Sequence, residues 1–287
     1  MNEKSYVENG AVFESGDNRL VGVLTRPLQP AGTGVVILVG GPQYRVGSHR
    51  QFALLARELG AAGIAVLRFD YTGMGDSEGE PQGFSEVSGD IDAAIRYLQQ
   101  EVPEVHHVAL WGLCDAASTA MLYAASDARV NALVLLNPWV HSGQYSPEVK
   151  FSHYYGPLLR GGETWRRLLA TPRSMLPALG EFISDMASLL KRRMALLMGF
   201  EQRVPLVDEM LTGFRQFKGK SLILISQLDL TAREFMELTE ADRRWRAAVN
   251  SPGVSIQQID GADHTFSNRA CQDEVTRLTL EWVSPAQ

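Results

Sequence analysis

Cysteine is scarce in this sequence, and its scarcity excludes two classes of fold. The 287 residues contain two cysteines, Cys114 and Cys271, which lie far apart and form no CxxC pair. This spacing fits neither a disulfide framework nor a zinc knuckle. Unpaired cysteines are typical of a reducing compartment, so we expect a cytoplasmic protein that holds no metal ion. We interpret Cys271, near the start of the last predicted helix, as structural.

Long apolar runs and basic blocks are also missing. The first ten residues, MNEKSYVENG, contain no apolar segment of the signal-peptide type, and no later run approaches the roughly 18 apolar residues that a membrane-spanning helix requires. Lys and Arg total 27 against 33 Asp and Glu, so the net charge is −6 and a nucleic-acid partner is not expected. Apolar residues make up 45% of the chain, which predicts a soluble globular protein rather than a disordered one.

Hydrophobic periodicity alternates between strand and helix along most of the chain. Residues 11–27 predict an antiparallel hairpin with Gly16-Asp17-Asn18 at its turn. The run VVILVGG at 35–41 is continuously apolar, as in a strand that is buried on both faces. Further strands are predicted at 63–70, 107–112, 132–137, 221–226 and 254–259, and helices at 49–59, 86–100, 115–126, 231–248 and near the C-terminus. This alternation predicts an α/β fold with a mostly parallel central sheet.

The alternation stops between residues 141 and 215. This stretch shows no buried strand but contains an amphipathic helical stripe that includes Met186 and Met194. Its ten basic and seven acidic residues give it the opposite sign of charge to the rest of the chain. We predict a helical cap at 141–215, inserted into a core of residues 1–140 and 216–287. We interpret its charge as a solvated helix face, in preference to contact with an acidic substrate or an anionic membrane surface.

The clearest chemical signal is the passage from the strand HVALW into Gly112-Leu113-Cys114-Asp115-Ala116. A nucleophile between a strand and a helix, with small residues two positions before and after it, fits a tight turn in which bulkier neighbours would collide. The usual sequence is GxSxG, whereas this chain has GxCxA. Free cysteine is often a small buried apolar residue, but a helix N-terminus favours the thiolate, so Cys114 is the predicted nucleophile. A carboxylate at Asp115 opposes ionisation of the sulfur unless it points away or is paired.

A base and an acid follow the last two strands of the predicted sheet. His264 lies in the loop after the last strand, and Asp229 follows the strand before it. The carboxyl ends of parallel strands share one edge of a sheet, where Cys114 also lies. We therefore predict that His264 is the general base and that Asp229 orients it. Asp263 is the alternative acid, but a residue adjacent in sequence seldom reaches its neighbour's ring.

Two backbone N–H groups are needed to stabilise the oxyanion of an acyl-transfer intermediate. One is predicted to come from Asp115, the residue after the nucleophile. The second should come from the loop Gly40-Gly41-Pro42-Gln43-Tyr44 after the strand VVILV. Proline has no N–H, so this donor is Gln43 or Gly41, and we favour Gln43. The residues predicted to contact the substrate are Gly40, Tyr44, Met186 and Met194.

These segments resemble the α/β-hydrolase superfamily over nearly the whole chain, including its order of nucleophile, acid and base. Four segments, GGPQYRVGSHRQF (40–52), RFDYTGMGDSEG (68–79), LWGLCDAAS (110–118) and VLLNPWV (134–140), are similar to those of the cysteine-containing hydrolases associated with the exosortase A system of exopolysaccharide-producing bacteria. The resemblance implies a hydrolase-type triad and a link to polysaccharide export and protein sorting, but no particular substrate. Cysteine in place of serine, and alanine in place of the last glycine, depart from the wider superfamily.

These residues are compatible with three functions. Attack by Cys114 on an ester, thioester or lactone gives an acyl-thioester, which water discharges in a hydrolase and an alcohol or amine discharges in an acyltransferase. Both use a small-molecule acyl substrate and no cofactor. A non-catalytic binding or regulatory protein of the same fold is the third, supported by the position of Asp115. Dinucleotide binding by Gly73, Gly75 and Gly79 is not favoured, because their spacing is GxGxxxG and the next predicted helix begins too late.

Overall fold

The structure of the protein is a computed structural model, which describes residues 5–41, 43–83, 86–140 and 205–284. The chain divides into two compact units. One unit consists of Met1–Val140 and Asp208–Gln287, and the other of His141–Val207. The predicted cap therefore lies almost wholly outside the described residues.

One helix spans the C-terminal boundary predicted for the cap. Residues 208–215 lie in helix α8 (Pro205–Gln216) and belong to the first unit. Met210, Leu211 and Phe214 of this helix are buried. Its apolar face therefore packs in the core unit, a contact that the pattern of the insertion did not indicate.

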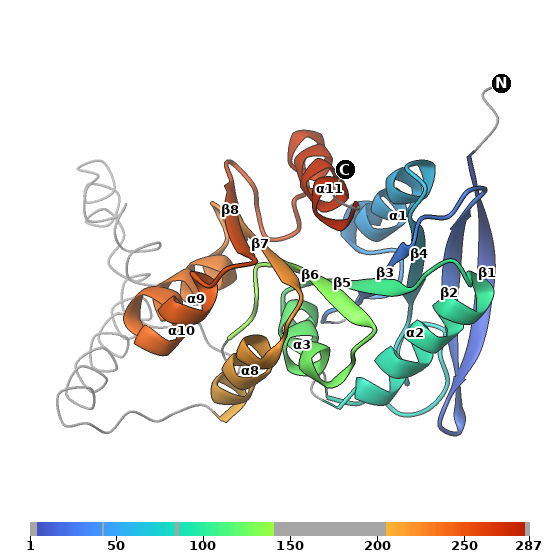
Figure 1. Ribbon diagram of the computed structural model, residues 1–287, viewed down its shortest axis with the longest axis horizontal. Coiled ribbons are helices and arrows are strands. Elements are labelled where there is room, and N and C mark those ends of the chain that lie inside the picture. The colour runs from blue at the N-terminus through green and yellow to red at the C-terminus, as the bar shows by residue number, and fades with distance from the viewer. Residues whose placement is uncertain (1–4, 42, 84–85, 141–204, 285–287) are drawn as a thin grey trace, which may run out of the picture. The chain divides into compact units, whose positions relative to one another are not determined.

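An eight-stranded sheet forms the centre of the first unit, with the strand order β1-β2-β4-β3-β5-β6-β7-β8 (Figure 1). The strands are β1 (Tyr6–Ser15), β2 (Asn18–Pro27), β3 (Thr33–Leu38), β4 (Ala65–Phe69), β5 (His107–Leu113), β6 (Val130–Leu136), β7 (Lys220–Ser226) and β8 (Val254–Ile259). β2 pairs antiparallel with β1 and with β4, and the remaining pairs are parallel. The predicted α/β class, with a mostly parallel sheet and an N-terminal antiparallel hairpin, is confirmed.

Helices cover both faces of this sheet. Besides α8, they are α1 (Gln51–Ala61), α2 (Ser88–Glu101), α3 (Asp115–Tyr123), α9 (Leu230–Ala241), α10 (Arg243–Val249) and α11 (Arg269–Val283), with short 3-10 turns η1 (Ser48–Arg50) and η2 (Ala124–Ser126). Figure 1 shows α1 and α11 on one side of the sheet and α2, α3 and α8 on the other. This two-sided cover explains why the central strands are apolar at nearly every position.

The central strands are fixed by close apolar packing. The side chains of Val35, Val36 and Ile37 in β3 are fully buried. Burial of each such side chain stabilises the fold by about 1.5–3 kcal/mol. On β5, Trp111 packs edge-on against Phe52 of α1, with ring centroids 5.4 Å apart. The strand that precedes Cys114 is therefore held by the helix covering it.

Two predicted elements differ from the observed ones. The hairpin begins at Tyr6 rather than at residue 11, because the first half of β1 is an edge strand with mostly exposed or half-buried side chains and so shows no apolar pattern. The single helix predicted at 231–248 is two helices, α9 and α10. The chain is extended at Asp242, whose side chain accepts a hydrogen bond from the Arg244 N–H and caps α10.

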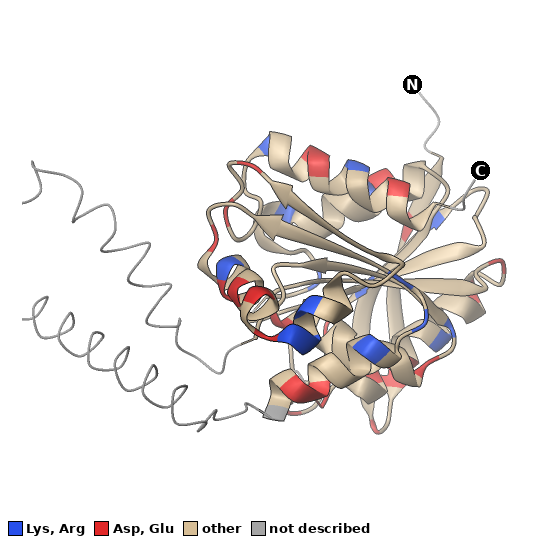
Figure 2. Ribbon diagram, turned by 60° about the vertical axis from the view of Figure 1, so that its left-hand side comes forward, with Lys and Arg blue, Asp and Glu red and all other residues tan. Residues whose placement is uncertain are grey.

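Charged residues of both signs are interspersed along the helices, strands and loops of the first unit, as the colours of Figure 2 show. Within the described ranges, no helix is both long enough and apolar enough to span a membrane.

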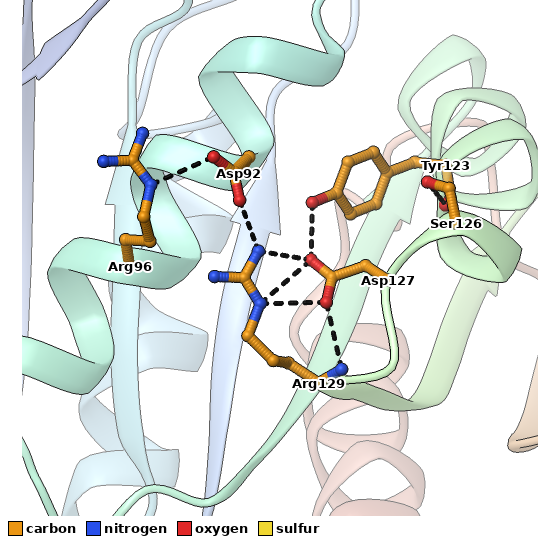
Figure 3. A network of polar contacts seen from close by, with 6 residues as sticks. All are labelled: Asp92, Arg96, Tyr123, Ser126, Asp127 and Arg129. Atoms are coloured by element: carbon orange, nitrogen blue, oxygen red, sulfur yellow. Dashed lines mark hydrogen bonds and ion pairs between the residues drawn. The ribbon is translucent and has the colours of Figure 1, made fainter.

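A polar network at the amino end of β6 connects three elements of the core (Figure 3). Arg129, just before β6, contacts Asp92 of α2 and Asp127, each at 2.5 Å. The Tyr123 hydroxyl, at the end of α3, donates to Asp127 at 2.6 Å. Burial and the Asp127 charge raise the pKa of Tyr123, so its hydroxyl keeps its proton and remains a donor. This network lies at the sheet edge opposite to the one where the candidate site forms.

Candidate active site

The predicted functional residues follow parallel strands in one half of the sheet. Cys114 directly follows β5, Asp229 lies after β7, and His264 lies in the loop after β8. The loop that begins with Gly40 and Gly41 follows β3, which pairs with β5. Because these strands are parallel, their carboxyl ends bring all four segments to one edge of the sheet.

Cys114 occupies a strained turn between β5 and α3. Its backbone angles are φ 62° and ψ −124°, a conformation that L-residues rarely adopt. Gly112 has no room for a side chain, since a Cβ there would lie 2.6 Å from the carbonyl oxygen of Ala116. Ala116 itself is buried, which explains why a small residue is needed there. The turn leaves the Cys114 side chain half-buried at the N-terminus of α3.

His264 is oriented by Asp229. The His264 Nδ1 lies 2.9 Å from the Asp229 Oδ2. Asp229 is also the N-cap of α9, where its two carboxylate oxygens accept hydrogen bonds from the N–H groups of Thr231 and Ala232. The carboxylate is therefore held in place by a helix end, and its backbone partners leave it free to bind the imidazole as well.

Both Asp229 and Cys114 affect the protonation of the His264 imidazole. The hydrogen bond to Asp229 and then the interaction with Cys114 raise the pKa of His264 to about 10, against the opposing effect of burial. The imidazole is therefore protonated at neutral pH. In this state it donates a proton rather than accepting one, and it is the natural counter-ion for a Cys114 thiolate.

Asp115 turns its carboxylate toward backbone N–H groups. The Gly41 N–H donates to Oδ2 and the Ala116 N–H to Oδ1, each at 2.9 Å. Burial raises the pKa of Asp115, while the hydrogen bonds from Gly41, Ala116 and its own N–H and the charge of His264 act against this rise. The carboxylate beside the sulfur is thus paired, but with N–H groups rather than with the side chain of a cation.

The predicted oxyanion loop lies close to the elbow at Gly40 and Gly41. A Cβ at Gly40 would lie 2.2 Å from the Asp115 carboxylate, so only glycine fits. The Gln43 side chain accepts a hydrogen bond from the Ser48 N–H at 3.2 Å. Tyr44 is exposed. The remaining predicted substrate contacts, Met186 and Met194, lie outside the described residues.

The sequence matches a known family across most of its length. The model of the alpha/beta hydrolase family matches residues 35–278, a range that includes the elbow, Asp229 and His264. The chain belongs to this family. The predicted superfamily is confirmed, while the closer resemblance to exosortase-associated hydrolases stays a prediction.

Two curated relatives of this alpha/beta hydrolase match it over shorter segments. The quorum-quenching protein AidA of Acinetobacter baumannii is 29% identical over 133 residues, which are 44% of this chain and 42% of AidA. The polyketide transferase grgF of Penicillium sp is 27% identical over 119 residues, which are 40% of each protein. The chain thus spans about two fifths of the length of these relatives.

Solved structures match this alpha/beta hydrolase over nearly its whole length at low identity. An esterase of Pyrococcus furiosus has a TM-score of 0.62 and 16% identity, covering 98% of this chain and 93% of its own. The alpha/beta hydrolase GrgF of Penicillium has a TM-score of 0.63 and 18% identity, covering 96% and 98%. Likeness at this identity establishes the fold.

Asp70 anchors the predicted oxyanion loop of this alpha/beta hydrolase, a role that the sequence did not indicate. Its fully buried carboxylate accepts from the Arg45 N–H at 2.7 Å and also forms an ion pair with the Arg45 guanidinium. The Asp76 N–H donates to the same carboxylate at 3.1 Å. Asp70 therefore ties the loop after β3 to the loop after β4. The segment RFDYTGMGDSEG could have suggested this role, because it places a short acidic side chain directly after a buried strand.

Asn137 is a second residue that sequence reasoning missed. Its side chain is fully buried after β6, donates to the Ser226 hydroxyl at 2.8 Å and accepts from the Ser226 N–H at 2.8 Å. It also donates to the backbone carbonyl of His264 at 3.2 Å. Asn137 thus joins the ends of β6 and β7 to the histidine loop. A polar residue directly after an apolar strand was the available signal.

In the described part of this alpha/beta hydrolase, no group of three or more His, Cys, Asp or Glu side chains is arranged to hold a metal ion. Cys271 is buried near the start of α11, and its sulfur accepts a hydrogen bond from the Asn268 side chain at 3.0 Å. That contact fits the structural role predicted for it.

Proposed function

We propose that the protein transfers acyl groups to water through a Cys114-His264-Asp229 triad, and so hydrolyses an ester, thioester or lactone. The observation that carries this proposal is the hydrogen bond of His264 to Asp229, together with the place of Cys114 in a strained turn at the N-terminus of α3, at the same edge of the sheet. The family of the chain and the name of the Pyrococcus furiosus esterase support ester chemistry.

Acylation begins from a thiolate and a protonated imidazole. The Cys114 thiolate donates an electron pair to the acyl carbon and forms the C–S bond, while the carbonyl π electrons move onto oxygen. As the tetrahedral intermediate collapses, the C=O bond forms again and the bond to the leaving group breaks. His264 gives its proton to the departing alkoxide or thiolate. A raised pKa suits this step, because the imidazole must arrive at it protonated.

Deacylation returns the site to its first state. His264 is now neutral and removes a proton from water as the water oxygen attacks the thioester carbon. Collapse of this second intermediate breaks the C–S bond, expels the Cys114 thiolate and releases the carboxylic acid. Asp229 stabilises the imidazolium in both half-reactions.

Acyl transfer to an alcohol or amine is the second candidate function. It uses the same residues, with the acceptor in place of water, and the printed name of the polyketide transferase grgF favours it. A role linked to exopolysaccharide export rests on the motif resemblance.

A labelling and turnover experiment tests the triad. The full chain is treated with chloroacetamide and, separately, with p-nitrophenyl butyrate, and the adducts are located by mass spectrometry. We expect Cys114 to be alkylated and acylated, and His264→Ala to lower p-nitrophenol release by about 100-fold or more. Cys271→Ala is the matched control and should behave as the native protein.

Two results would contradict the proposal. One is alkylation of Cys114 and Cys271 at equal rates, which indicates a non-catalytic protein. The other is undiminished turnover in Cys114→Ala.

Cys114→Ser should keep the fold and weak activity. If this variant equals the native protein on every ester, the thiol has no special role. Added alcohols or amines that capture the acyl group faster than water would favour the transferase.

A further inference from the structure

The Asp115 carboxylate occupies the Gly41 N–H, which is one of the donors predicted for an oxyanion. The Gly41 N–H donates to this carboxylate, and the Ala116 N–H donates to it as well. An N–H group forms one strong hydrogen bond at a time. Gly41 was the alternative to Gln43 as the second oxyanion donor, and an oxyanion that binds the Gly41 N–H must compete with Asp115 for it.

The loop at Gly40 and Gly41 is sterically complementary to the Asp115 carboxylate. A Cβ on Gly40 would lie only 2.2 Å from the Asp115 Oδ1. The loop and the side chain therefore fit together only because residue 40 is glycine. Gly41 has φ +58°, which aims its N–H with a backbone conformation that glycine adopts readily. The loop that should bind the oxyanion is thus shaped around an anion supplied by the chain itself.

We propose that Asp115 controls the acylation of Cys114 and helps to select the acyl donor. Its carboxylate must leave the Gly41 N–H before the oxyanion forms there, and its charge disfavours donors that carry a negative charge near the carbonyl. This inference rests on the proposed function, because it concerns the same acylation step. It adds a residue that sets the rate and the preferred charge of the substrate.

The negative charge of Asp115 should slow acylation. A carboxylate and an oxyanion are both negative, so they cannot share one donor, and hydrogen bonds to a charged acceptor are stronger than those between neutral groups. A neutral substrate carbonyl is a weaker acceptor than the carboxylate, so the resting contact opposes acylation. An anionic acyl donor meets this opposition and, in addition, repulsion from the Asp115 charge.

The test compares acylation with alkylation in Asp115→Asn and Asp115→Ala. Acylation is followed in a single turnover with p-nitrophenyl butyrate and with the anionic p-nitrophenyl hemisuccinate, whose acyl chain has the same number of carbons. Alkylation by chloroacetamide needs no oxyanion donor and reports the reactivity of the sulfur alone. Asp260→Asn is the matched control, because it removes the same charge from an exposed carboxylate that binds Gln258.

We expect both Asp115 variants to raise the ratio of acylation to alkylation by about tenfold for the butyrate ester, and several-fold more for the hemisuccinate. The control should keep the native ratio. A ratio that stays at the native value or falls in Asp115→Asn, with unchanged thermal stability, would overturn the inference. If acylation occurs at Cys114 but ignores Asp115, the proposed function stands alone; if Cys114→Ala is still acylated, the function itself fails.

A second measurement does not depend on the folding of either variant. A trifluoromethyl ketone forms a tetrahedral adduct with a thiolate and places a stable oxyanion at the site. In a crystal structure of this adduct of the native protein, we expect the oxyanion to accept from the Gly41 N–H and the Asp115 carboxylate to have moved away. An Asp115 carboxylate still bound to Gly41, with the oxyanion elsewhere, would contradict the inference.

Discussion

The Asp229 carboxylate serves the fold and the proposed chemistry at once, and two substitutions can separate these roles. Asparagine caps a helix about as well as aspartate, so Asp229→Asn should keep α9 stable, whereas Asp229→Ala should cost about 1 kcal/mol. Both should lose most ester turnover, because neither offers His264 a negative charge. Urea unfolding and p-nitrophenol release measure the two effects. Native turnover in Asp229→Asn would show that the charge is not used.

The protonation of His264 is a second property of a single residue that can be tested. Its folded pKa of about 10 lies above the value of 6.5 for a free imidazole. Protonated His264 therefore stabilises the fold fully below pH 6.5, and this contribution is lost as the pH rises through about 10. We expect an NMR titration of the His264 ring to have its midpoint well above 6.5, and lower in Asp229→Asn. A native midpoint near 6.5 would disprove the link to Asp229 and Cys114.

Among the elements, the loop after β3 depends on the loop after β4. Removing one partner of a buried ion pair is costly, so we expect Asp70→Ala to lower the free energy of unfolding by about 3 kcal/mol and to slow acylation of Cys114 by freeing the oxyanion loop. Asp76→Asn is the matched control, because Asp76 pairs with the same Arg45 from an exposed position and should change stability by less than about 1 kcal/mol. Equal effects of the two substitutions would show that Asp70 has no special role.

Sequence periodicity predicted the sheet, most helices and the elbow, because each depends on neighbours within one turn or strand. The small residues around Cys114 are an example, because the backbone of the same turn leaves no room for larger side chains there. Asn137 and Asp70 could not be found this way, because their partners are backbone groups of loops that meet only in the folded chain. The break at Asp242 was hidden for a related reason: its capping contact competes with a continuous helical pattern.

In the first unit, the polar network that supports the fold and the residues of the proposed triad lie at opposite ends of the strands. The Arg129 network connects α2, α3 and β6 at the amino edge of the sheet. Cys114, Asp229 and His264 lie at the carboxyl edge, on loops and helix ends. A parallel sheet buried on both faces holds these loops at fixed spacing, so residues far apart in the sequence come within hydrogen-bonding distance.

The backbone at Cys114 connects this chemistry to the stability of the whole protein. Substitution of alanine by glycine usually destabilises a protein, yet at φ 62° and ψ −124° the order should reverse. We expect Cys114→Gly to unfold at higher temperature than Cys114→Ala, by about 1 kcal/mol in stability. The opposite order in a melting experiment would show that the turn is relaxed. If selection for activity were lost, glycine at position 114 would therefore be favoured, because it would give a more stable protein that lacks the nucleophile.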